Sequence, residues 1–357
     1  MSSIVGLRIT IIINSLAVGG VQRLVVDQAN ELARQGAHVR IIFLEEDVRD
    51  GLDTELDRAV CVQRIAVKGN KDLLGFVRLW RHVCRERSDV VMTHMWLANN
   101  HGRLAAWCAR VPCIAAFEHS IYDTKKPLHQ FLADRLLQYC GDVIAVSHAV
   151  ASSLTRHGIC ANRISVVPNG ICLNRYMGAV HEMKRHHVGR TFIFVGRLVG
   201  DKMVHIPIEA ATSLPDVRLL VVGQGPEQNA LVRVAERGAY PGNVIFLGVR
   251  KDVPQLLLAS DCLVLPSIRE GFGLVIVEAY ACGLPVIVSG VHGTRELVEH
   301  DKTGLIVDGS VREWMAAMEK MTSDHKLRAR LSISALAQAG HYSIESHVRQ
   351  LVKVLTR

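Results

Sequence analysis

The segment Asp261–Gly283, DCLVLPSIREGFGLVIVEAYACG, contains the residue types and spacing best suited to chemistry. An apolar strand is followed by a loop with Glu270, and a helix that begins near Gly273 carries Glu278 two turns later. The glycines let the backbone approach a ligand, and the free amides of a helix start suit a phosphate. The two carboxylates would then accept hydrogen bonds from sugar hydroxyls. A surface loop followed by a solvated helix fits this spacing equally well.

Two cations follow a second predicted strand, Thr191–Val195. Arg197 comes directly after the strand and Gly196, and Lys202 lies five residues further on. Both side chains could reach one diphosphate and neutralise a leaving nucleotide as its bond to a sugar breaks. Because ordinary loops also hold arginine and lysine, this pair does not identify a site by itself.

Two weaker signals come from the first half of the chain. Gly19 and Gly20 separate the first strand from the predicted helix Val21–Gln35, where paired glycines permit close approach of the backbone to a phosphate or sugar. His119 follows a strand that ends at Phe117 and could donate a hydrogen bond to a bound sugar. A packed or solvated histidine is the simpler alternative, since the chain has 17 of them.

The glycine pattern argues against a dinucleotide-dependent dehydrogenase. Gly223-Gln224-Gly225 follows a predicted strand but lacks the third glycine of a G-x-G-x-x-G fingerprint. No acidic residue follows at the distance expected for a ribose contact.

The elements that position these residues alternate between short apolar strands and longer helices. Continuous apolar strands separated by helices predict parallel sheets covered on both faces, here in two doubly wound domains. We expect an N-terminal domain over 1–175, a C-terminal domain over 176–340, and an amphipathic helix within 341–357 that packs back on the first domain. The predicted strands are Arg8–Ile13, His38–Phe43, Val90–Thr93, Cys113–Phe117, Val143–Val146, Ile164–Val167, Thr191–Val195, Arg218–Val222, Val244–Phe246, Cys262–Leu265, Pro285–Val288 and Leu305–Val307.

Composition limits the class of protein. The 357 residues are 49% hydrophobic and 21% charged, which suits two domains with real cores and excludes a disordered chain. A net charge of +8 favours anionic partners. The nine cysteines form no C-x-x-C pair, so we expect reduced thiols. The N-terminal apolar run has no cleavage site and no segment reaches the roughly 20 apolar residues of a spanning helix, so we expect a cytoplasmic location.

The run EGFGLVIVE, from Glu270 to Glu278, resembles the E-x7-E signature of retaining glycosyltransferases of family four, which have the GT-B fold. That fold is α/β, with two Rossmann-like doubly wound domains and a cleft between them. The resemblance extends over nearly the whole chain. It also includes the Gly19-Gly20 loop, EHS at 118–120, PNG at 168–170, GRL at 196–198 with Lys202, GLPVIVS at 283–289 and TGLIV at 303–307.

The resemblance implies a role for each matching residue. Arg197 and Lys202 would hold the donor diphosphate, Glu270 the donor-sugar hydroxyls, and His119 the sugar from the other domain. The remaining donor-binding residues would be Glu278 at the ribose, Val249 and Arg250 at the base, Gly19 and Gly20 near the diphosphate, and the backbone of Gly271, Phe272, Gly273 and Leu274. Two departures from the family pattern are Met203, where glycine often follows the lysine, and Cys172, where aspartate often follows the PNG.

The implied activity is transfer of a hexosyl or N-acetylhexosaminyl group from a UDP- or GDP-linked sugar to a glycan or lipid-linked acceptor, with retention. We expect a role in bacterial surface polysaccharide synthesis, without a metal or other cofactor. No strict D-x-D occurs, and the nearest acidic run, Asp53, Glu55 and Asp57, follows no predicted strand. A nucleotide-sugar epimerase of the same fold is the alternative.

The basic stretch Lys68–Arg87 could bring such an enzyme to its acceptor. It holds six cations and two acidic residues, with apolar residues interleaved. A basic amphipathic stretch of this kind can lie on an anionic membrane, here at the inner face, although an ordinary surface helix with one buried face has the same pattern. We expect no nucleic-acid partner, because no recognised binding module is present.

Overall fold

The computed structural model describes residues 4–45, 51–121, 138–176 and 191–356. They divide into two compact units, Met1–Gly170 together with Ile344–Arg357, and Ile171–Ser343. We expected the domain boundary between residues 175 and 176, and the residues that follow it, 177–190, lie outside the described residues.

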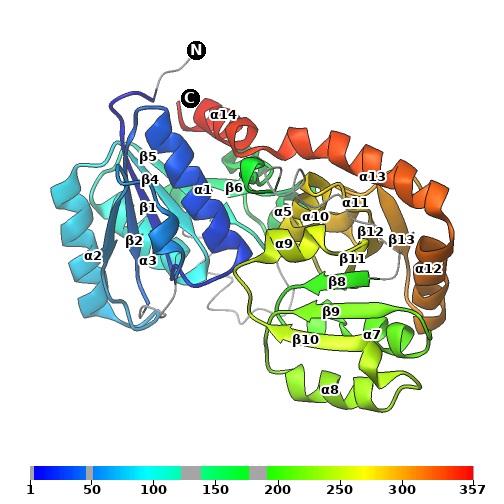
Figure 1. The fold of residues 1–357 in the computed structure, drawn as a ribbon. Coiled ribbons are helices and arrows are strands. Elements are labelled where there is room, and N and C mark those ends of the chain that lie inside the picture. The colour runs from blue at the N-terminus through cyan, green and yellow to red at the C-terminus, as the bar shows by residue number, and fades with distance from the viewer. Residues whose placement is uncertain (1–3, 46–50, 122–137, 177–190, 357) are drawn as a thin grey trace. The chain divides into compact units, whose positions relative to one another are not determined.

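The first unit is built on a parallel sheet of seven strands (Figure 1). The strand order is β3-β2-β1-β4-β5-β6-β7. The strands are β1 (Arg8–Ile13), β2 (His38–Phe43), β3 (Cys61–Arg64), β4 (Val90–His94), β5 (Cys113–Glu118), β6 (Asp142–Ala145) and β7 (Ile164–Val166). The helices are α1 (Gly20–Arg34), α2 (Leu73–Glu86), α3 (Trp96–Cys108), α5 (His148–Arg156) and α14 (Ile344–Leu355), with short 3-10 turns at Leu52–Glu55, Gln138–Cys140 and Ala161–Arg163.

The second unit is built on a parallel sheet of six strands in the order β10-β9-β8-β11-β12-β13. Its strands are β8 (Thr191–Val195), β9 (Arg218–Val222), β10 (Val244–Gly248), β11 (Cys262–Leu265), β12 (Val286–Ser289) and β13 (Gly304–Val307). Its helices are α7 (His205–Thr212), α8 (Gln228–Glu236), α9 (Val253–Leu258), α10 (Leu274–Ala281), α11 (His292–Arg295), α12 (Val311–Ser323) and α13 (His325–Ala339), with 3-10 turns at Gly200–Lys202, Pro241–Asn243 and Gly340–Tyr342.

The two parallel sheets and all twelve predicted strands are confirmed, five with the predicted ends and seven with ends shifted by one or two residues. The sequence analysis missed β3, an edge strand whose four residues are all exposed. With no buried face to select apolar residues, its sequence CVQR has neither an apolar run nor an alternating pattern.

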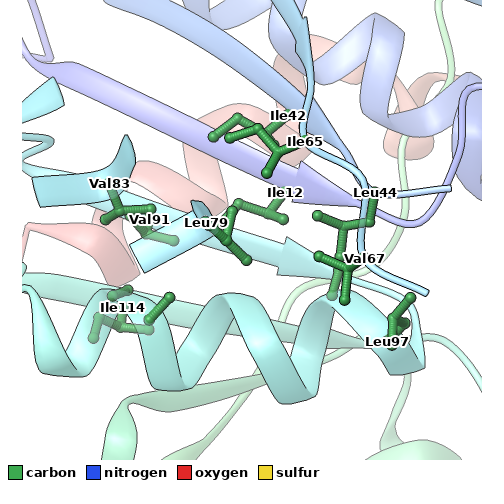
Figure 2. Close-up of a cluster of buried hydrophobic side chains, with 13 residues drawn as sticks. Ile12, Ile42, Leu44, Ile65, Val67, Leu79, Val83, Val91, Leu97 and Ile114 are labelled. Carbon is green, nitrogen blue, oxygen red and sulfur yellow. The ribbon is translucent and has the colours of Figure 1, made fainter. Parts of the chain in front are cut away.

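One core of the first unit lies between the sheet and helices α2 and α3 (Figure 2). Ile12 of β1 and Val91 of β4 contribute from the sheet, and Leu79 and Val83 contribute from α2. These side chains are at most 1% exposed, so each stabilises the fold by roughly 1.5–3 kcal/mol through burial. The inner face of α2 is therefore buried in the core, and only the outer face of that helix can contact a partner.

Helix α14 packs against α1 in the first unit, although α1 ends at Arg34 and α14 begins only at Ile344 (Figure 1). His347 of α14 is buried between Gln28 of α1 and the segment before Gly170. Its Nδ1 lies 2.7 Å from the carbonyl of Pro168, and its Nε2 lies 2.9 Å from Nε2 of Gln28. Because a carbonyl only accepts, His347 carries its proton on Nδ1 and accepts from Gln28 at Nε2.

Candidate functional site

Sheet topology explains why distant loops meet in the second unit. In the order β10-β9-β8-β11-β12-β13, the connections from β8 and β11 leave the sheet in opposite directions. The loops after these two neighbouring strands therefore flank the switch point at which open parallel sheets bind ligands. Arg197 and Lys202 follow β8, and Glu270 follows β11.

Lys202 and Glu270 form an ion pair across these two loops. Nζ of Lys202 lies 2.5 Å from Oε2 of Glu270, and the two side chains are 19% and 15% exposed. The hydroxyl of buried Ser267 donates to the same oxygen at 3.3 Å. At this place the ammonium of Lys202 can donate a hydrogen bond to a phosphate, and the carboxylate of Glu270 can accept one from a sugar hydroxyl.

Glu270 is held by a loop whose backbone needs glycine. Gly273 adopts the left-handed conformation, with φ +90°, directly before α10. A Cβ at this position would also lie 2.9 Å from Cδ1 of Ile276 and 3.4 Å from Cγ of Glu270. Phe272 is 4% exposed and makes an edge contact with Tyr342, with ring centroids 5.8 Å apart. The loop is therefore fixed on both sides of its turn.

A second ion pair links the same two loops. Arg269 contacts Asp201 at 3.1 Å, and the amide of Ile268 donates to the carbonyl of Asp201 at 2.9 Å. The sequence analysis missed both Asp201 and Ser267, because neither belongs to a recognisable pattern.

Arg197 is exposed, and its side chain makes no ion pair within the described part of the chain. Arg250 is already engaged, since its guanidinium binds both carboxylate oxygens of Asp252 at 2.7 and 2.6 Å. This contact lowers the pKa of Asp252. Val249 is 47% exposed after β10. The structure thus brings Lys202 and Glu270 together, while Arg197 remains an exposed cation on the same loop as Lys202.

Glu278 lies on α10, beyond the N-terminal turn of that helix, and is partly exposed. Leu274, the first residue of α10, is also partly exposed, whereas Gly271 is buried. The predicted loop-to-helix transition near Gly273 therefore has the expected position in the chain.

The Gly223-Gln224-Gly225 segment has a structural role. Gly223 has a φ of +129°, and a Cβ there would lie 1.9 Å from the carbonyl oxygen of Gly196. Backbone hydrogen bonds of 3.0 Å run from Gly196 to Val222 and from Leu198 to Gln224. Glycine here lets the loop after β9 pack on the loop that holds Arg197 and Lys202.

In the first unit the predicted residues surround the corresponding switch point, between β1 and β4. Gly19 is the N-cap of α1 in extended conformation, and Gly20 is the exposed first residue of that helix. No side chain caps this helix start, and its first turn holds no acidic residue. Its amides and positive end suit an anion.

His119 directly follows β5, next to β4. Burial lowers its pKa to about 3, so the ring is neutral near pH 7. Nε2 of His119 lies 3.1 Å from Nδ1 of His94, the last residue of β4. His94 was missed because the predicted strand ended at Thr93 and one further histidine gave no signal among 17.

The acidic run near the first switch point serves structural contacts. Glu55 pairs with Arg23 of α1, and Asp57 accepts the amide of Ala59 at 2.8 Å. Among the described residues no three His, Cys, Asp or Glu side chains come together as a set that could hold a metal ion.

Comparison with known proteins identifies the family. Residues 18–175 match the model described as Glycosyltransferase Family 4, and residues 183–338 match the model described as Glycosyl transferases group 1. A D-inositol 3-phosphate glycosyltransferase of Rhodococcus jostii is 30% identical, over 92% of this chain and 82% of its own.

The names of two further similar proteins state what those proteins bind or act on. The UDP-Gal:alpha-D-GlcNAc-diphosphoundecaprenol alpha-1,3-galactosyltransferase of Escherichia coli is 29% identical, over 87% of this chain and 86% of its own. HepE of Anabaena, solved in complex with UDP and glucose, is 25% identical and superimposes with a TM-score of 0.85, over 98% of this chain and 99% of its own. The chain belongs to the family 4 and group 1 glycosyltransferases and has their GT-B fold, as the E-x7-E resemblance predicted.

Proposed function

We propose that this glycosyltransferase moves a hexosyl or N-acetylhexosaminyl group from a UDP-sugar to a hydroxyl of a lipid-linked acceptor, with retention of configuration. This proposal rests on the ion pair between Lys202 and Glu270 at the switch point of the second sheet. The named UDP-galactose donor and diphosphoundecaprenol acceptor of the Escherichia coli relative support this choice, as does UDP in the Anabaena structure.

The second unit would bind the donor in this proposal. Arg197 and Lys202 neutralise the diphosphate as it leaves, which stabilises an oxocarbenium-like transition state. Glu270 accepts hydroxyls of the donor sugar, and Glu278 accepts those of the ribose. The amides of Gly271 to Leu274 contact the sugar and phosphate, and Val249 and Arg250 border the base. GDP-sugars remain the second donor class to test.

The first unit would bind the acceptor and complete the donor contacts. The uncapped start of α1 at Gly19 and Gly20 stabilises negative charge on the diphosphate. His119 donates a hydrogen bond to the donor sugar. A neutral ring suits this role, because it can donate without adding a charge beside an oxocarbenium-like centre.

We also propose that the outer face of α2 binds an anionic membrane and brings the active site to its lipid-linked acceptor. Leu79 and Val83 are buried in the core, but Leu73 and Leu74 are 77% and 78% exposed in the first turn. The six cations of the stretch 68–87 are all exposed: Lys68, Lys71, Arg78, Arg81, Arg85 and Arg87. Among the described helices none is long and apolar enough to span a bilayer. A role in the synthesis of bacterial surface polysaccharides fits such an attachment.

A ligand screen tests the donor class. UDP-galactose, UDP-glucose, UDP-N-acetylglucosamine and GDP-mannose are added singly, and the melting temperature is measured, since a ligand bound only by the folded state raises it. We expect stabilisation by UDP-sugars and little by GDP-mannose. The products formed with a diphosphoundecaprenol-linked sugar are then examined for anomeric configuration. An inverted product contradicts retention, and conversion of the donor without acceptor would favour an epimerase.

A further inference from the structure

His94 and His119 share one proton between their rings. His94 pairs with Phe117 across β4 and β5 and stacks on that ring at 4.2 Å, and His119 continues the stack at 5.3 Å from His94. Nδ1 of His94 and Nε2 of His119 are 3.1 Å apart. Burial lowers the pKa of both groups, so both are neutral and one nitrogen of the pair donates while the other accepts.

The two arrangements leave different atoms without a partner. Nε2 of His94 and Nδ1 of His119 are both buried, and neither atom has a hydrogen-bond partner among the described residues. If His119 donated from Nε2, the second N–H would lie on Nε2 of His94, a residue that is 0% exposed. If His94 donates from Nδ1, the second N–H lies on Nδ1 of His119, an atom that is also buried although the residue as a whole is partly exposed. Each arrangement leaves one N–H and one lone pair without a partner, so burial alone does not choose between them. Only the second leaves His119 with an N–H outside the pair, which the sugar contact proposed for it requires.

A third described histidine near the pair does not change this choice. His347 has its ring centroid 6.4 Å from that of Phe117. Its Nδ1 donates to the carbonyl oxygen of Pro168 at 2.7 Å, and burial lowers the pKa of His347 to about 4. It therefore adds no positive charge to the stack near pH 7.

We propose that His94 is a positioning residue that donates its Nδ1 proton to Nε2 of His119 and so keeps the His119 proton on Nδ1. Nδ1 is then the nitrogen that His119 offers as a donor to a sugar hydroxyl. This proposal rests on the function proposed above for His119, but the location of the proton can be measured without any substrate.

The first experiment locates the proton by nitrogen NMR of the imidazole rings in the full-length protein. The signals of His119 are identified by their loss in His119→Gln. We expect protonated Nδ1 in the wild type and in His94→Asn, whose amide can still donate. We expect protonated Nε2 in His94→Asp, which has the same shape but only accepts. Protonated Nε2 in the wild type would overturn the proposal even if the His94→Asp variant failed to fold.

The second experiment measures affinities for UDP and UDP-galactose by calorimetry. His94→Asp should weaken UDP-galactose binding roughly tenfold and leave UDP binding unchanged, because only the sugar contact depends on the His119 proton. His94→Asn should stay close to the wild type. Equal loss of both ligands would mean a merely structural role and contradict the proposal. If the wild type binds neither ligand, the proposed donor class fails while the NMR result still decides the proton position.

Discussion

Lys202 is the residue whose charge the proposed mechanism needs most. Replacing it with glutamine should lower kcat/KM for a UDP-sugar by roughly 100–1000-fold, because a preorganised cation at the leaving diphosphate is lost. Its removal also leaves Glu270, 15% exposed, without its ion-pair partner. Lys302→Gln is a matched control, because Lys302 pairs with Glu299 at 2.8 Å in the same unit. Equal turnover in the two variants would remove the diphosphate assignment.

Met203 gives a physical reason for the glycine that often follows this lysine in the family. Met203 adopts φ +47° and ψ 36°, the left-handed conformation that costs a side-chain residue about 1–2 kcal/mol. Met203→Gly should therefore raise the free energy of unfolding, or leave it unchanged if chain entropy offsets the relief. Met203→Val, which is β-branched, should lower it by more than 1 kcal/mol. Urea unfolding measures both, and equal stability of the two variants would contradict the strain.

Among the elements, α14 depends on a neutral histidine. His347 has a pKa of about 4 in the folded protein and near 6.5 when unfolded. The unfolded chain therefore binds the additional proton first, and stability falls as the pH drops from 6.5 to 4, by up to about 1.4 kcal/mol per pH unit for this group. His119, with a pKa of about 3, contributes in the same direction.

His347→Asn separates the contribution of α14 from that of the stacked pair. Its amide can still donate to the Pro168 carbonyl but does not titrate. We expect a shallower fall of unfolding free energy between pH 6.5 and 4 than in the wild type, measured by urea titration at each pH. An unchanged slope would show that His347 does not titrate on unfolding.

The strands could be predicted because most are continuous apolar runs such as RITIII in β1, which only a sheet covered on both faces explains. The exposed edge strand β3 has no such run and was missed. The E-x7-E motif indicated Glu270, but its pairing with Lys202 arises from the neighbouring positions of β8 and β11 in the sheet. Likewise, the contact between His94 and His119 depends on strand register, which a single sequence does not encode in any pattern.

At the scale of the whole molecule, charge and exposed apolar surface are the basis of the proposed membrane attachment. The chain carries a net charge of +8, and six exposed cations lie on α2 and in the residues that flank it, with exposed Leu73 and Leu74 in the first turn of the helix. Each cation near an anionic bilayer contributes about 1 kcal/mol, and each inserted leucine adds a further contribution through burial. The combination predicts binding that needs both anionic lipid and these two leucines.

Flotation with vesicles tests this directly. The wild type should float with phosphatidylglycerol-containing vesicles at low salt and be released as ionic strength rises, because screening weakens the cation contribution. Leu73→Ser combined with Leu74→Ser should reduce flotation several-fold. Ile333→Ser combined with Leu336→Ser is the matched control, since these α13 residues are 73% and 48% exposed in the second unit. Equal binding to neutral vesicles, or an equal loss in the control, would contradict a membrane role for α2.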